Sequence, residues 1–187
     1  MRKFVKVVPC TIALLILTMV LSPTLASSTG PTVKIVGGNG VRINSIIFST
    51  YHFSPGKTHV RPGQMVTFLN TGTCTDCQHT ISLVNDSQLP AAFDDVFACG
   101  APGTVCFNIV SAHFPQGPGG PTTNLIANVT GEPTGFHGGN SFLITQGQSL
   151  EIGISAPTGT TLHYMCAFHA WMQGTIVVGQ NNENSQD

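Results

Sequence analysis

Three side chains with metal-binding chemistry lie three residues apart near the end of this 187-residue chain. Cys166 offers a thiolate, His169 an imidazole and Met172 a thioether. Copper prefers such soft and borderline donors, and one tight loop can present all three to a single ion. The spacing therefore predicts a copper site that needs a second imidazole from elsewhere in the chain.

Strand alternation nominates His79 as that second imidazole. In 79–84 and 162–166 every second residue is apolar apart from one terminal donor, which is His79 in the first segment and Cys166 in the second. Successive side chains of a strand point to opposite faces, so each segment turns an apolar face to the core and carries one ligand at its end. We expect the other histidines in loops or on the surface, with His163 facing away from Cys166. They are His52, His59, His113, His137 and His163.

The elements that would position these donors are short apolar runs of strand length. They cover 32–36, 44–48, 65–69, 79–84, 141–145, 150–154, 162–166 and 175–178. Gly- and Pro-rich turns separate the runs, and no sustained period of 3.6 residues lies between them. The pattern predicts an all-β sandwich. Residues 85–139 alternate little and are expected to form one long loop insertion, in which Asp94 and Asp95 are solvated.

Six cysteines suggest a disulfide framework. Leaving out Cys10 in the N-terminal segment, an odd number remains: Cys74, Cys77, Cys99, Cys106 and Cys166. We expect Cys166 to be the unpaired thiol and the other four to form two bridges that pin the insertion, with the pairing left open. The Cys74-Thr75-Asp76-Cys77 segment is also compatible with a redox dithiol or a zinc site. No helix pattern follows it, and secretion favours disulfides.

The N-terminus has the pattern of a secretory signal peptide over 1–26. Arg2, Lys3 and Lys6 precede an uncharged run over 7–21, and Ala26 fits a cleavage site. The prediction is an extracytoplasmic protein, periplasmic or on the outer cell surface, with a domain over 27–179 and a flexible tail over 180–187. An uncleaved N-terminal membrane anchor is the alternative. Only four basic residues follow residue 26, which excludes a nucleic-acid-binding patch.

Two segments resemble the cupredoxins, the blue-copper electron carriers. The first covers 60–70 and leads into His79-Thr80-Ile81, and the second covers 164–178. The short Cys-x-x-His-x-x-Met spacing is similar to that of amicyanin, whereas plastocyanins have a longer one. The resemblance implies a Greek-key β-sandwich with one type 1 copper ion. It gives His79 as the upstream imidazole, Cys166 as the thiolate, His169 as the solvent-edge imidazole and Met172 as the axial ligand.

The chain departs from the family pattern at two places. Thr80 stands where the family usually has an Asn that ties the two ligand segments together, and the interval from His79 to Cys166 is longer than in small cupredoxins. The first departure bears on the reduction potential and the groups around the ligands. The resemblance leaves 85–139 unaccounted for.

The expected function is one-electron transfer between redox proteins that dock near His169, Phe168 and Trp171. A copper enzyme is not expected, because Met165 and Ala167 flank Cys166 where electron-relaying histidines would stand, and the chain has no His-x-His pair. The alternative is a non-redox copper store or extracellular binding module on the same fold.

Overall fold

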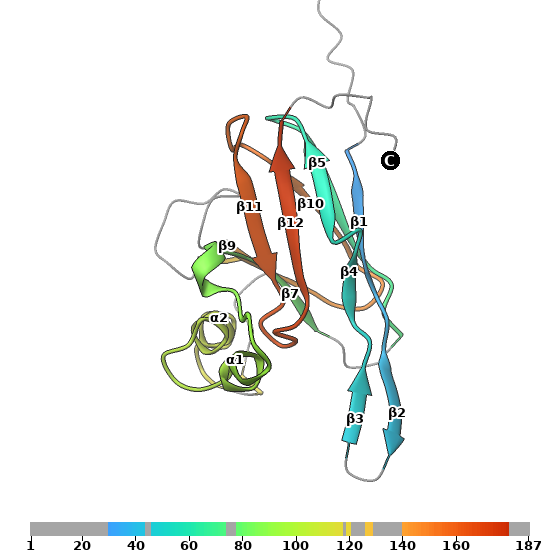
Figure 1. Ribbon diagram of the computed structural model, residues 1–187, viewed down its shortest axis with the longest axis vertical. Helices are drawn as coiled ribbons and strands as arrows, with labels where there is room; N and C mark the ends of the chain where they lie inside the picture. Colours follow the sequence, from blue (N-terminus) through green and yellow to red (C-terminus); the bar gives the residue numbers. More distant parts are fainter. Residues whose placement is uncertain are drawn as a thin grey trace, which may run out of the picture.

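The computed structural model describes residues 30–43, 46–73, 78–117, 119–120, 126–128 and 140–179. The predicted signal peptide over 1–26, the predicted tail over 180–187, Cys74, Cys77 and His137 lie outside these residues. Two β-sheets face each other, and a hairpin and a helical segment extend from one end of the sandwich (Figure 1). The β-sandwich prediction is confirmed. None of the helices in the described part of the chain has the length and apolar character needed to cross a membrane.

Each sheet combines parallel and antiparallel strands. The four-stranded sheet has the order β10 (Ser149–Gly153), β6 (Met65–Asn70), β1 (Thr32–Val36), β4 (His52–Ser54). The six-stranded sheet has the order β5 (Lys57–Val60), β12 (Gln173–Val178), β11 (Thr161–Met165), β7 (His79–Val84), β9 (Asn140–Ile144), β8 (Ile126–Asn128). The hairpin is β2 (Asn39–Ile43) with β3 (Ile46–Ser49). The chain crosses from one sheet to the other between β4 and β5, between β5 and β6, and between β6 and β7. As a result, strands that are distant in sequence lie side by side in each sheet.

The core between the sheets is built by alternating strands. In β6 and β12 every second residue is buried, as expected for strands with one solvent-facing side. An aromatic cluster lies at its centre: Tyr164 meets Phe53 and Phe68 edge-on, with ring centroids 4.8 and 5.3 Å apart. This edge-to-face packing stabilises the contact between the sheets and holds β11 in place.

Strands β7 and β9 are buried on both of their faces. The inner face joins the core, and helix α2 (Val105–His113) lies on the outer side, where Ile109 is buried with Val84 of β7 and His113 contacts Ser141 of β9. Ile109 is also buried with Met165, Ala167 and Ala170, which belong to β11 and the loop after it. Figure 1 shows α1 (Phe93–Ala98) and α2 beside the loop that joins β11 to β12.

The long insertion over 85–139, expected as a loop, has regular secondary structure in its described part. It contains the 3₁₀ turn η1 (Asp86–Gln88), helices α1 and α2 and strand β8. Asp94 and Asp95 stand in the first turn of α1, where an acidic side chain complements the helix dipole. Thr104 caps α2 by accepting a hydrogen bond from the Phe107 backbone. Tertiary packing against the sheet stabilises these short helices, which lack a strong amphipathic period.

The eight predicted strands correspond to β1, β3, β6, β7, β9, β10, β11 and β12, and the short strands β2, β4, β5 and β8 were not predicted. One disulfide joins Cys99 to Cys106, across the turn between α1 and α2. Cys166 is the unpaired cysteine of the described residues, as expected. Cys74 and Cys77 lie outside the described residues, so the second expected bridge stays a prediction.

Candidate metal centre

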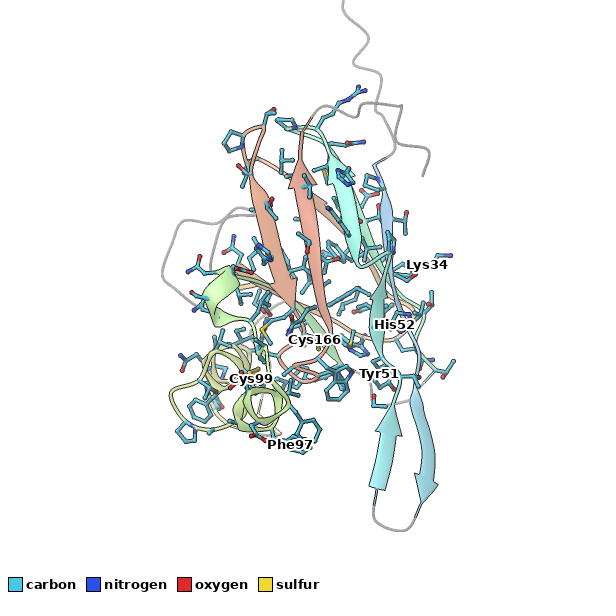
Figure 2. All side chains as sticks on the ribbon, in the orientation of Figure 1. Lys34, Tyr51, His52, Phe97, Cys99 and Cys166 are labelled. Atoms are coloured by element: carbon cyan, nitrogen blue, oxygen red, sulfur yellow. A yellow bond between two sulfur atoms is a disulfide. The ribbon has the colours of Figure 1, made fainter. Side chains whose placement is uncertain are left out.

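His79, Cys166 and His169 converge at one end of the sandwich. The distance from Cys166 Sγ to Nδ1 is 3.7 Å for His79 and 3.6 Å for His169. An ion about 2.3 Å from sulfur and about 2.0 Å from nitrogen, with an angle of about 110–120°, would place the two donors about 3.5–3.7 Å apart. The observed spacing therefore fits a shared ion. Figure 2 shows Cys166 at this end of the sandwich, with Tyr51 on the same end.

Two strands and one tight turn position the three donors. His79 is the first residue of β7, and Cys166 follows the last residue of β11. Strands β7 and β11 are antiparallel neighbours, with Tyr164 paired to Leu83 and Met165 to Ser82. The end of β11 therefore lies against the start of β7. The alternation argument from the sequence thus led to the histidine that the fold brings to the thiol.

Residues 166–172, which we call the ligand loop, are closed by their own backbone. The Cys166 N–H donates to the Met172 carbonyl at 3.0 Å, the His169 N–H to the Cys166 carbonyl at 3.3 Å, and the Met172 N–H to the His169 carbonyl at 2.7 Å. Met172 is fully buried in the same core cluster as Cys166. The loop therefore fixes the backbone of three of the four predicted ligands without help from an ion.

Aromatic rings enclose the two imidazoles. The Tyr51 ring centroid lies 4.8 Å from that of His79 and 4.8 Å from that of His169. Trp171 packs edge-on against His169 at 5.2 Å, and its Nε1–H donates to the Tyr51 carbonyl at 3.1 Å. His79 and Cys166 are fully buried, whereas His169 is half-buried. His169 is thus the predicted ligand with access to solvent.

Thr80 makes the hydrogen-bonded link between β7 and the ligand loop that an Asn would otherwise make. Its backbone N–H donates to Cys166 Sγ at 3.4 Å, and its Oγ1 accepts the Ala167 N–H at 2.8 Å. The side chain therefore links β7 to the ligand loop. The departure from the family pattern at this position changes the group that makes the link and keeps the link itself.

The other histidines that the structure describes, His52, His59, His113 and His163, do not reach the site's donors. His52 and His59 are exposed, and His163 Nδ1 lies 3.7 Å from Asp86 Oδ1, away from Cys166 as expected. The expectation for His113 is wrong. It is fully buried in the last turn of α2, because the helix lies over the outer face of β9. Tyr51 and His113 are the site's neighbours that the sequence pattern did not reveal.

Burial sets the protonation of the donors. It lowers the pKa of His79 to about 4, with a further contribution from the nearby His169, and it also lowers the pKa of His169. Burial raises the pKa of the Cys166 thiol, against hydrogen bonds from Thr80, Phe168 and His169 that lower it. Both imidazoles are therefore free to bind a cation at neutral pH, while an ion must displace the thiol proton.

We expect the metal-free protein to lose stability as the pH falls from about 6.5 toward 4. The two imidazoles have lowered pKa values in the folded chain, so the unfolded chain takes up protons first and is favoured by acidification. Denaturant unfolding at pH 7.0 and 5.5 measures the effect. The pH slope should become shallower in His79→Gln and remain in His52→Gln, which alters an exposed histidine. Equal slopes in all three proteins would contradict the expectation.

No protein-family model and no curated protein matches the chain. Among solved structures, the chain is similar to dithionite-reduced auracyanin from the photosynthetic bacterium Roseiflexus castenholzii, with 19% identity, coverage of 82% of this chain and 98% of that one, and a TM-score of 0.42. Auracyanin A, a "blue" copper protein of Chloroflexus aurantiacus, has 22% identity, coverage of 80% and 100%, and a TM-score of 0.41. A purple cupredoxin of Nitrosopumilus maritimus has 15% identity, coverage of 80% and 99%, and a TM-score of 0.39.

Proposed function

We propose that this chain is an extracytoplasmic one-electron carrier that holds a single type 1 copper ion through His79, Cys166, His169 and Met172. The observation that carries the proposal is the near-equal spacing of the two Nδ1 atoms from Cys166 Sγ, 3.7 and 3.6 Å. Two imidazoles and one thiolate with a weak axial thioether are the donor set of blue-copper electron-transfer sites. Copper bound there supplies one-electron chemistry by changing between its two oxidation states.

The chain's own contribution is a dry, fixed set of donors. His79, Cys166 and Met172 are fully buried, and Tyr51 packs against both imidazoles. The backbone bonds of the ligand loop limit the movement of Cys166, His169 and Met172. Because the donors need to move little when the charge of the site changes, the reorganisation energy of electron transfer is small. The apolar surroundings of the thiolate and its hydrogen bonds tune the reduction potential.

The surface around His169 supports a docking role. Trp171 is 45% exposed beside this half-buried imidazole, and Phe168 is half-buried on the same loop. An apolar patch over a solvent-edge ligand suits brief contact with a redox protein, because it brings the partner close to the site without strong charge pairing. We therefore propose that electrons enter and leave through His169. The signal-peptide pattern over 1–26 supports delivery outside the cytoplasm.

A carrier is favoured over a copper enzyme by the number of donors. Four protein ligands leave no open position at which a substrate could bind the ion. Within the described residues, the group of at least three His, Cys or acidic donors able to share an ion is the one around Cys166. The proposal therefore assigns no substrate, only redox partners.

The copper-loaded protein tests the proposal directly. We expect an intense visible band from thiolate-to-copper charge transfer, an electron paramagnetic resonance spectrum of one copper per chain, and a reversible voltammetric wave that carries one electron. A colourless protein, or one that binds copper without reversible redox behaviour, would favour the storage or binding module instead. Zinc-loaded protein serves as the control, since zinc occupies the same donors without redox chemistry.

A further inference from the structure

Tyr51 brings the four-stranded sheet into contact with the candidate metal centre. The predicted ligands belong to the six-stranded sheet: one begins β7, and the other three lie in the ligand loop between β11 and β12. Tyr51 directly precedes β4 of the other sheet. Its ring centroid lies 4.8 Å from that of His79 and 4.8 Å from that of His169, and the two imidazole centroids are also 4.8 Å apart. One phenol ring therefore contacts both imidazoles at the same time.

His79 depends on such a contact because its second ring nitrogen is not held by a hydrogen bond. Its Nδ1 lies 3.7 Å from Cys166 Sγ, and its Nε2 is buried with no hydrogen-bond partner among the residues that the structure describes. A metal-binding imidazole is usually oriented by a hydrogen bond from its second nitrogen to a carboxylate, a carbonyl or water. At His79 ring packing has to take over that role. Tyr51 meets this ring edge-on, with 70° between the planes, an arrangement that aromatic pairs favour.

His169 is bordered by two aromatic rings. Tyr51 packs against it with 48° between the planes, and Trp171 packs edge-on with a centroid distance of 5.2 Å. The Trp171 Nε1–H donates to the Tyr51 carbonyl at 3.1 Å, which ties these two aromatic residues to each other. Rotation of the half-buried imidazole away from Cys166 is therefore opposed by both rings.

The backbone that carries Tyr51 is itself held in place. The Thr50 N–H donates to the Gly38 carbonyl at 3.0 Å, and β4 pairs with β1 directly after Tyr51. Gly37 has a φ of +101°, and a Cβ atom there would lie 2.9 Å from the Tyr51 nitrogen, so this close approach of the two segments requires glycine. Tyr51 is 1% exposed. Its ring is therefore a fixed surface against which neighbouring side chains can be oriented.

We propose that Tyr51 is a positioning residue for the metal centre, which holds the imidazoles of His79 and His169 in their ligating orientation by ring packing before an ion binds. This inference rests on the proposed copper site and assigns a part in it to the sheet that supplies no ligand. Donors that are already oriented lose little side-chain entropy when an ion binds, which raises the affinity for the ion. The ring of Tyr51, rather than its hydroxyl, carries the effect.

Copper affinity and spectra of variants at position 51 test the proposal. In Tyr51→Leu we expect the affinity for copper, measured by competition with a chelator, to fall by about tenfold, as when a group that orients a metal ligand is removed. The electron paramagnetic resonance spectrum should broaden, because loosened imidazoles give a spread of copper geometries. Tyr51→Phe keeps the ring and should retain the affinity and the line width of the wild type. A loss in Tyr51→Phe as large as that in Tyr51→Leu would overturn the proposal.

Phe53→Leu is the matched control. It also shortens a buried aromatic side chain at β4, but Phe53 packs against Phe68 and Tyr164. We expect this variant to unfold at a lower denaturant concentration and to bind copper with an affinity within about twofold of the wild type. An equal loss of copper affinity in folded Phe53→Leu and Tyr51→Leu proteins would mean that general loosening of the core, and not contact with the imidazoles, causes the loss.

The metal-free protein provides a second measurement, in which the wild type needs neither copper nor a substitution. Carbon-13 NMR relaxation of the imidazole C–H groups of His79 and His169 should give order parameters of about 0.85, as for a rigid backbone. Tyr51→Leu should lower both values, and Trp171→Leu should lower that of His169 more than that of His79. Values below about 0.6 in the wild type would overturn the proposal. So would unchanged values in a folded Tyr51→Leu protein.

The two measurements separate this inference from the proposed function. If the copper-loaded wild type shows no intense visible band, the copper-carrier proposal fails. The order parameters of the two imidazoles in the metal-free protein still decide whether Tyr51 positions them.

Discussion

Cys166→Ser is expected to remove the intense visible band of the copper-loaded protein completely. The band arises from charge transfer between a thiolate and copper, and a serine hydroxyl stays protonated and is a hard donor that copper disfavours. The fold should persist, because the two side chains differ by a single atom and the backbone of the ligand loop is held by its own hydrogen bonds. Absorption and electron paramagnetic resonance spectra of both proteins, loaded with equal copper, measure the effect.

The matched control replaces cysteines outside the site. Cys99 and Cys106 form a disulfide between α1 and α2, and the double variant Cys99→Ser, Cys106→Ser should keep the visible band. Retention of the band in Cys166→Ser would mean that another group supplies the thiolate, which would refute the ligand assignment. Loss of the band in the double variant alone would point to the helical insertion instead.

Gly174→Ala is expected to destabilise the folded protein by about 3 kcal/mol, at the upper end of the usual cost of overpacking a core. Gly174 pairs with Tyr164 across β11 and β12, and a Cβ atom at position 174 would lie only 2.3 Å from Cζ of the Tyr164 ring. That ring has no room to move away, because it is fully buried against Phe53 and Phe68. Denaturant unfolding of the metal-free protein gives the change in free energy.

Gly179→Ala is the control for this substitution. Gly179 follows β12 directly, and nothing lies within 4 Å of the position that its Cβ would take. We expect a change within about 0.5 kcal/mol, as at most surface positions. If the two variants unfold at the same denaturant concentration, the close approach of Tyr164 to the backbone at position 174 does not limit the core.

Three of the four metal ligands could be predicted from the sequence because they lie close together in the chain. Cys166, His169 and Met172 lie within seven residues, so one tight turn suffices to bring them together, whatever the rest of the fold. His79 is 87 residues away from Cys166, and only the assumption that two apolar-faced strands point into one core connected them. The structure places the donor atoms of His79, Cys166 and His169 within 4.8 Å of one another, so that assumption holds for His79.

The parts that sequence analysis missed depend on contacts between distant segments. Tyr51 reaches both imidazoles because β4 pairs with β1. The register of these two strands cannot be predicted from a local sequence pattern. Helix α2 is short and rich in β-branched and aromatic residues, which weakens its helical signal. His113 becomes buried only when this helix covers β9, and a lone histidine at the end of a segment without clear periodicity gives no sign of that.

The closed backbone of residues 166–172 bears on the order of events during maturation. A chain whose donor turn is already shaped by its own hydrogen bonds can fold first and bind its ion afterwards. His79, Cys166 and Met172 are fully buried, so the partly exposed imidazole of His169 is the side from which a metal ion can reach the site. An incoming ion would therefore pass the His169 ring and the Trp171 ring that packs against it.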